Sequence, residues 1–281
     1  MTAIDAICEK YSGSRIESFD ICIVPNFLSK VLSEADKTAT SPRQLQEALE
    51  ANYPVRRAGE AIVPGRVQWV EGTNAALMYR GNALKRTKIW LQRGEPNDVG
   101  FAYYYYTGVQ WRVVPAQTDW AKCPEISSLV PRYDAFCNDV GAKPANQVIV
   151  TAYRNGDHNI GAHFDKPRSI AESDDDGASL ITVVKIGQCG RPFELYRKGE
   201  DTPFWSKTLA PGTAVIMTLE ANLATKHAVP VVDEKECGPS GSLVWRSITT
   251  VVSPEELRKK LAASDRAKEH AQGKKRARAV R

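Results

Sequence analysis

Two residues that can bind a metal ion, His163 and Asp165, lie two positions apart at the end of the segment VIVTAYRNGDHNIGAHFD (148–165). This segment is typical of a strand, a polar turn and a second short strand. Side chains two apart on a strand point to the same side, so an imidazole and a carboxylate can face one point. The chain has four histidines, and His227, which closes the strand-like run TAVIMTLEANLATKH, is the natural third ligand. Two histidines and one carboxylate suit Fe(II) sites with open coordination positions.

Arg246 strengthens this prediction, because it lies 19 residues after His227 on the otherwise apolar strand SLVWRSITTVV. An arginine buried there without a partner would be costly. Its partner is either an acid of the protein or a bound dicarboxylate held by the planar guanidinium, and the preceding triad favours the dicarboxylate. Zinc is open as an alternative metal, but Arg246 favours iron. His158 is out of phase with His163, and we expect it on the surface.

The composition bounds the class of protein. Hydrophobic residues make up 42% and charged residues 25%, as in ordinary globular proteins. No apolar run approaches the roughly 20 residues of a membrane helix, and the N-terminus lacks a signal-peptide core. We therefore expect an intracellular protein, nuclear or cytoplasmic, without membrane attachment. Six scattered cysteines without a CxxC pair fit a reducing compartment and argue against a disulfide framework.

The net charge of +5 belongs to the C-terminal tail. From Pro254 onward ten Lys or Arg accompany four Asp or Glu, a balance of +6, so the rest of the chain sums to −1. The tail reads either as a solubilising end or as a nuclear-targeting or nucleic-acid-contacting segment. We expect three regions: an N-terminal helical or mixed extension packed on the core (1–55), a β-domain (56–253) and the basic tail (254–281), partly helical or disordered.

Short strands separated by turn signals dominate the middle of the chain. We expect strands within 16–27, 62–91, 99–114, 148–165, 178–186, 192–196, 209–219 and 242–252, with a hairpin over 194–205. Helical spacing appears at 28–35, at 42–51 after a Ser41 N-cap, and at 123–140 before Gly141. These elements predict a mainly β protein with flanking helices, in the α+β class, with a jelly-roll core.

The aromatic stretch VGFAYYYYTGVQWRVV (99–114) has two readings. It is a strand with one packed and one amphipathic face, or else Tyr103, Tyr105, Trp111 and Arg112 line a pocket where a flat group can stack. The polar loop 166–177 is likewise either a solvated loop or a segment that contacts substrate.

Three segments together resemble the AlkB-like branch of the Fe(II)/2-oxoglutarate dioxygenases. They are TAYRNGDHNIGAHFD (151–165), PGTAVIM (211–217) with His227, and WRSITT (245–250). The stretch YYYYTGVQW resembles the Tyr-x-x-Ser-Gly sequence that precedes the core in that family. The resemblance covers roughly residues 89–252. It implies a double-stranded β-helix (jelly-roll) core with Fe(II) bound by His163, Asp165 and His227.

The resemblance also implies how 2-oxoglutarate and O2 would be used. Arg246 would hold the distal carboxylate of 2-oxoglutarate, Tyr153 would hydrogen-bond this cosubstrate, and Thr151 and Thr250 are the remaining cofactor-binding candidates. 2-Oxoglutarate would be decarboxylated to succinate while a C–H bond is hydroxylated. On an N-methyl group, the hydroxymethyl product would break down to formaldehyde and the free base.

The substrate implied is a modified nucleobase in DNA or RNA, as in DNA repair, flipped out of its stack to reach the site. Tyr103, Tyr105, Trp111 and Arg112 would contact the base, and Lys166 and Arg168 would contact phosphates. The oligomeric state is not predicted.

Several departures from the family pattern concern the substrate. Repair members carry an asparagine where this chain has Thr151, and their last strand reads Arg-x-Asn-x-Thr-x-Arg. When that pattern is aligned on Arg246, its later positions are Ile248, Thr250 and Val252 in this chain. Some members also carry an acidic residue two positions after the metal-binding aspartate, where this chain has Pro167. A 2-oxoglutarate-dependent hydroxylase of a protein, lipid or small molecule is therefore an alternative. A non-enzymatic binding module that kept the fold is another.

Overall fold

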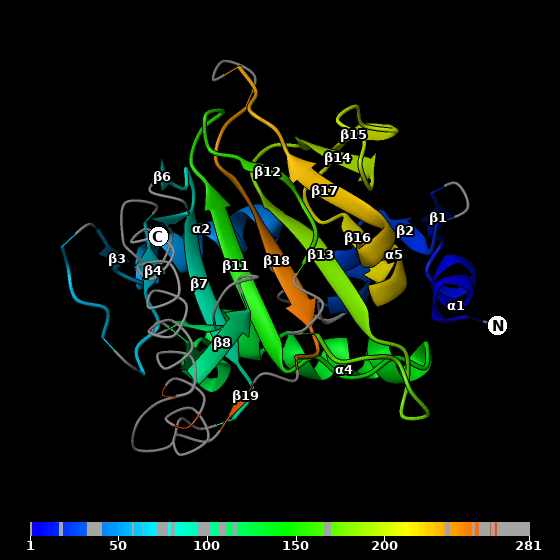
Figure 1. Ribbon diagram of the computed structural model, residues 1–281, viewed down its shortest axis with the longest axis horizontal. Helices are drawn as coiled ribbons and strands as arrows, with labels where there is room; N and C mark the ends of the chain where they lie inside the picture. Colours follow the sequence, from blue (N-terminus) through cyan, green and yellow to red (C-terminus); the bar gives the residue numbers. More distant parts are fainter. Residues whose placement is uncertain are drawn as a thin grey trace, which may run out of the picture.

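Two β-sheets, whose central strands are antiparallel, lie face to face and enclose the pocket that contains the predicted metal ligands. Strands β11, β18 and β13 run side by side through the centre of the molecule (Figure 1). The structure, a computed structural model, describes residues 2–16, 19–32, 41–57, 59–63, 65–71, 78–79, 82–94, 102–106, 111–114, 117–165, 170–233, 237–248, 251–252, 259 and 262.

The larger sheet has ten strands, in the order β1-β2-β16-β13-β18-β11-β7-β4-β3, with β10 paired to β7. Its buried strands are rich in valine and isoleucine, which suit a pleated, enclosed surface. The strands are β1 (Ser14–Arg15), β2 (Ile21–Val24), β3 (Val55–Arg56), β4 (Trp69–Val70), β7 (Thr87–Gln92), β10 (Thr118–Asp119), β11 (Gln147–Tyr153), β13 (Leu180–Gly187), β16 (Ala214–Thr218) and β18 (Ser240–Arg246).

The smaller sheet has four strands in the order β12-β17-β14-β15. They are β12 (Ile160–His163), β14 (Arg191–Arg197), β15 (Trp205–Leu209) and β17 (Thr225–Val229). The eight strands β11 to β18 thus divide equally between the two sheets. The molecule is a mixed α/β protein with large sheets and few helices, and this division is consistent with a jelly-roll.

The helices before residue 140 pack on the face of the large sheet that points away from the small sheet, whereas the short helix after β16 packs with the side chains between the two sheets. Tyr133 of α4 stacks on Trp245 of β18 with ring centroids 4.6 Å apart, and its hydroxyl donates to Thr182 Oγ1 at 2.8 Å. In Figure 1, α4 crosses one end of the central strands. The helices are α1 (Ala3–Lys10), α2 (Pro42–Asn52), α3 (Pro124–Ser127), α4 (Val130–Asp139) and α5 (Leu219–Ala224), with a π-helical turn η1 (Leu28–Leu32) and a 3-10 helix η3 (Trp120–Lys122).

Two small sheets complete the described strands. One has the order β19-β8-β9, formed by β19 (Val251–Val252), β8 (Ala102–Tyr106) and β9 (Trp111–Val114). The other pairs β5 (Met78–Tyr79) with β6 (Asn82–Ala83). None of the helices in the described residues is long and apolar enough to cross a membrane.

Several predicted elements are confirmed. The Ser41 hydroxyl caps α2 by accepting from the Gln44 amide at 3.1 Å, and the Gln44 side chain returns a bond to the Ser41 amide. β14 and β15 form the predicted hairpin. Both follow from local rules, namely the capping box and the turn signal between two strands.

Other predicted elements are wrong in their extent. The helix expected over 123–140 is two helices separated near Leu129, and the strand-like run ending at His227 contains helix α5. The last long strand ends at Arg246, because the Asn146 side chain bonds both backbone groups of Ile248, at 2.7 and 2.9 Å. By contrast, the strand expected within 16–27 is confirmed as β2, which pairs with β16 in the large sheet.

Candidate metal centre

His163, Asp165 and His227 converge at one point between the two sheets. One potential ligand atom from each lies within 4.8 Å of the others, and the described residues contain no other such group of three histidine, cysteine or acidic side chains. His163 and His227 are register partners on β12 and β17, and their ring centroids are 4.3 Å apart. The pairing of two distant strands thus places two imidazoles side by side.

Hydrogen bonds orient the two histidines. His163 Nδ1 lies 2.9 Å from the Gly161 carbonyl, which can only accept, so this nitrogen carries the proton and Nε2 is left to bind a metal. His227 stacks on Phe193 at 5.8 Å, and its Nδ1 is buried without a hydrogen-bond partner. An orphaned imidazole nitrogen beside a second imidazole and a carboxylate fits a metal-binding cluster.

Asp165 is held by two residues from other elements. The Asn222 side chain on α5 accepts from the Asp165 amide at 2.8 Å and donates to its carbonyl at 2.9 Å. Arg246 at the end of β18 donates through Nη1 to Asp165 Oδ2 at 3.1 Å. The other carboxylate oxygen, Oδ1, lies 4.0 Å from His163 Nε2. One oxygen is therefore engaged by arginine while the other faces the histidines.

The electrostatics favour the protonation states that metal binding requires. Burial lowers the pKa of His163 and of His227, and the neighbouring His227 lowers that of His163 further. Burial alone would raise the pKa of Asp165, but the Arg246 guanidinium and the two histidines hold it below its ordinary value. At neutral pH the site therefore offers two neutral imidazoles and one carboxylate.

Arg246 is buried and faces the metal side of the sheet, as predicted, but its described partner is a protein acid. Its Nε donates to Gln147 Oε1 at 2.7 Å while Nη1 bonds Asp165. Alternate residues of β18 face the metal pocket, and these are Ser240, Ser242, Val244 and Arg246. The strand ends at Arg246. Arg246 is thus the last inward residue of the strand, whereas the sequence pattern had placed it first.

The pocket around the triad contains other predicted residues. Thr151 and Tyr153 of β11 line it, opposite Ser242 and Ser240 of β18. Aromatic and aliphatic side chains close the remaining walls, namely Ile149, Ile160, Val183, Phe193, Val229 and Val244. A small polar ligand bound to the metal would therefore meet hydroxyl groups on one side and apolar surface on the others.

Three functional candidates escaped the sequence analysis. Lys88 of β7 lines the metal pocket, and burial lowers its pKa to about 7. Lys185 and Asn222 are buried nearby. Lys185 lies in the apolar run LITVVKI and carries the same sequence signal as Arg246, a charge that needs a partner in an otherwise apolar strand.

The remaining predicted site residues lie elsewhere in the chain. Thr250, Lys166 and Arg168 lie outside the described residues, as does the tail apart from two positions. Tyr103, Tyr105, Trp111 and Arg112 lie on the paired strands β8 and β9, but only their backbone is described. His158 is half-buried and accepts from the Arg154 amide at 3.3 Å, outside the triad.

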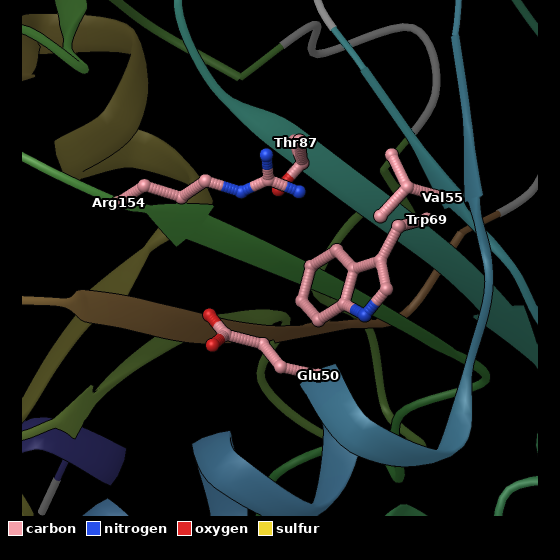
Figure 2. A pocket seen from close by; sticks show the side chains of 5 residues that line it. All are labelled: Glu50, Val55, Trp69, Thr87 and Arg154. Carbon is pink, nitrogen blue, oxygen red and sulfur yellow. The ribbon is translucent and has the colours of Figure 1, made fainter.

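A second cavity, of about 210 Å³, lies behind the large sheet. Figure 2 shows its lining: the Arg154 guanidinium reaches toward Thr87 on one side of the cavity, Glu50 of α2 lies opposite them, and the Trp69 ring lies beside the space between. Thr87 and Lys88 are consecutive on β7 and point to opposite faces, so this cavity and the metal pocket are separated by the sheet. Its described lining contains none of the predicted site residues.

Comparisons with known proteins give only distant structural likenesses. No family model and no curated protein matches the sequence. The chain resembles the structure of OsALKBH1 at 12% identity and a TM-score of 0.45, covering 84% of this chain and 99% of that one. It also resembles an oxidoreductase of the 2OG-Fe(II) oxygenase family from Burkholderia pseudomallei at 14% identity and 0.42, covering 88% and 89%.

A third similar structure is a prolyl hydroxylase from Trichoplax adhaerens, in complex with a hypoxia inducible factor peptide fragment. The identity is 11% and the TM-score 0.44, with 87% of this chain and 88% of that one covered. TM-scores below 0.5 give these likenesses no weight for the activity of this chain.

Proposed function

We propose that this chain is an Fe(II)/2-oxoglutarate-dependent dioxygenase whose strands β11 to β18 form a double-stranded β-helix. The observation that carries the proposal is the convergence of His163, Asp165 and His227 within 4.8 Å, at a pocket between two sheets. Three protein ligands leave coordination positions for a cosubstrate and oxygen, as in sites of the two-histidine, one-carboxylate type.

Each residue of the site has a distinct role in this proposal. The two histidines and Asp165 would hold Fe(II), and Arg246 and Asn222 fix the orientation of Asp165. Outer partners of this kind fix metal ligands in place. Bound there, the ferrous ion would supply O2-dependent hydroxylation coupled to the decarboxylation of 2-oxoglutarate to succinate.

The pocket walls serve the same reaction. Thr151, Tyr153 and Ser242 offer hydroxyl groups to the polar atoms of the cosubstrate. Phe193 packs against His227 and, with the aliphatic walls, would exclude water from the metal side of the pocket once cosubstrate is bound. A water-poor site favours reaction with the substrate over side reactions.

We further propose that the substrate is a modified nucleobase in DNA or RNA. The sequence resemblance and the basic tail support this reading, and the tail would add phosphate contacts. The competing proposal is a protein, lipid or small-molecule substrate. Its support is Thr151, which lines the pocket where nucleic-acid repair members carry an asparagine.

The test is a substrate screen with purified, iron-loaded protein, measuring succinate formed from 2-oxoglutarate. Methylated DNA and RNA oligonucleotides should raise succinate release and yield formaldehyde in equal amount. His227→Ala serves as the control and should abolish both. Turnover stimulated only by peptides, lipids or metabolites would favour the competing substrate class, and no metal-dependent turnover of 2-oxoglutarate at all would refute the activity.

A further inference from the structure

Lys185 carries an ammonium group into the protein interior without a hydrogen-bond partner. The residue lies on β13, is 2% exposed, and its Nζ has no partner among the described residues. Val183, two positions earlier, lines the metal pocket, so Lys185 lies on the same face of the sheet. Its Nζ is 5.6 Å from the centroid of the Tyr153 ring.

Two more unpaired donors surround the same ring. The centre of the Arg191 guanidinium lies 5.2 Å from the centroid of the Tyr153 ring. Its Nη1 and Nη2 donate to backbone carbonyls, but its Nε is buried without a hydrogen-bond partner. Ser240 is the register partner of Tyr153, and its buried hydroxyl is also unpaired. Three buried donors, two of them on cationic side chains, are therefore grouped around one tyrosine.

The described side chains supply no carboxylate to this group. The ionisable residues that face Lys185 are Arg191 on β14, Tyr153 on β11, and the thiols of Cys189 and Cys237. Burial raises the pKa of Cys189 to about 11 and raises that of Tyr153 as well, so both are neutral near pH 7. An ammonium buried without an anion is costly, and the arrangement fits a bound anion that completes it.

The unpaired donors adjoin the metal pocket. Ser242, which lines the pocket, is the register partner of Lys185, and Tyr153 lines the pocket as well. Arg246, by contrast, already donates to Asp165 and Gln147. Among the described side chains, Lys185 faces no carboxylate, whereas Lys88, which lines the pocket, and Arg246 both interact with the metal ligand Asp165.

We propose that Lys185, assisted by Arg191 Nε and the Ser240 hydroxyl, binds the distal carboxylate of 2-oxoglutarate, the role that the sequence pattern gave to Arg246. This inference rests on the proposed function, because it requires the keto-acid end of the molecule to lie at the triad. Charge-assisted hydrogen bonds from two cationic side chains would explain why these donors have no protein partner.

The experiment compares two ligands on Mn(II)-loaded protein by calorimetric titration. They are 2-oxoglutarate and 2-oxopentanoate, the five-carbon keto acid without the distal carboxylate. The wild type should prefer 2-oxoglutarate by about 100-fold, the size of effect seen when a buried charged pair is broken. Lys185→Met should remove this preference by weakening 2-oxoglutarate alone, with 2-oxopentanoate affinity unchanged.

Arg246→Met is the matched comparison, because it removes a buried cation that already has a protein acid as partner and introduces the same side chain. It should weaken both ligands to a similar degree through Asp165, and Arg246→Lys provides a second variant if the first does not fold. If Lys185→Met keeps the wild-type preference, if Arg246→Met alone removes it, or if the wild type binds both keto acids equally, the Lys185 assignment is wrong. Wild-type protein that binds Mn(II) but neither keto acid would instead refute the proposed function.

Folding of the lysine variant gives an independent readout. Methionine replaces an unpaired buried cation with an apolar chain of similar length, so the metal-free variant should unfold at a higher temperature than the wild type. A lower unfolding temperature would show that the ammonium has a stabilising partner within the protein, which contradicts the proposal.

Discussion

Asn222 holds both backbone groups of Asp165, accepting from its amide at 2.8 Å and donating to its carbonyl at 2.9 Å. Asn222 is fully buried on α5, the short helix between β16 and β17. The same helix leads into the strand that carries His227. One asparagine therefore couples the loop after β12 to the element that precedes the third candidate ligand.

Replacing Asn222 with alanine should weaken metal binding by about 10- to 100-fold, the usual effect of losing a partner that orients a ligand. The Asp165 backbone would lose two hydrogen bonds and with them its fixed position. Mn(II) titration calorimetry measures the change, with Asn138→Ala on the exposed face of α4 as the matched control. Equal Mn(II) affinity in the Asn222 variant and the control would show that the two hydrogen bonds from Asn222 do not position the Asp165 carboxylate.

Replacing Arg246 with methionine should raise the pKa of Asp165, because the guanidinium is the main group that lowers it against burial. Protons would then compete with the metal ion for the Asp165 carboxylate at higher pH than in the wild type. Mn(II) affinity measured from pH 5 to pH 8 should decline at a higher pH in the variant than in the wild type. Superimposable pH profiles would mean that Arg246 does not act on this carboxylate.

Lys185→Met should stabilise the metal-free protein at pH 7 by a few kcal/mol. Burial lowers the pKa of Lys185 from 10.5 to about 8, and a tenfold change in the proton-binding constant corresponds to about 1.4 kcal/mol. Because the folded-state pKa is the lower one, the unfolded chain binds more protons between pH 8 and 10.5. The loss of folding stability caused by charged Lys185 is therefore full below pH 8 and decreases as the pH rises from 8 to 10.5.

Urea unfolding at pH 7 and pH 10 measures this effect. The stability difference between Lys185→Met and the wild type should be largest at pH 7 and smaller at pH 10. Lys207→Met, at an exposed position on β15, is the control and should show little difference at either pH. A difference that is constant with pH would mean that the charge of Lys185 is not responsible.

The affinity for 2-oxoglutarate should fall as the pH rises above 8. Without ligand, Lys185 loses its proton near pH 8. A carboxylate bound beside Lys185 would raise the pKa of the lysine and keep the lysine charged. Binding at pH 8.5 should therefore take up a proton, which calorimetry in two buffers of different ionisation enthalpy detects. Lys185→Met should take up less of a proton than the wild type, because only Lys88 of the two pocket lysines remains, and equal uptake in variant and wild type would assign the proton to another group.

The placement of His163, Asp165 and His227 could be predicted because it depends on strand periodicity and on the small number of histidines. The partner of Arg246 could not, because it depends on where β18 ends. Asn146 ends that strand by bonding the backbone of Ile248, a contact between residues 102 positions apart. A sequence pattern that continues beyond the strand gives no sign of this stop.

Asn222 and Lys185 were not predicted as site residues from the sequence, for two different reasons. The apolar run around Asn222 reads as a strand, although Thr218 caps a helix by accepting from the Ala221 amide at 3.2 Å. The capping threonine was visible in the sequence, but the partner of Asn222 was not. Lys185 was visible as a charge in an apolar strand, but the sequence does not show that its Nζ has no hydrogen-bond partner among the described residues.

Anaerobic titration with Fe(II), followed by 2-oxoglutarate, tests the central claim most directly. One ferrous ion should bind per chain, and 2-oxoglutarate should then bind with a new metal-to-ligand charge-transfer absorption. His227→Ala should show neither. Binding of 2-oxoglutarate without metal, or wild-type protein that takes up no ferrous ion, would contradict the account.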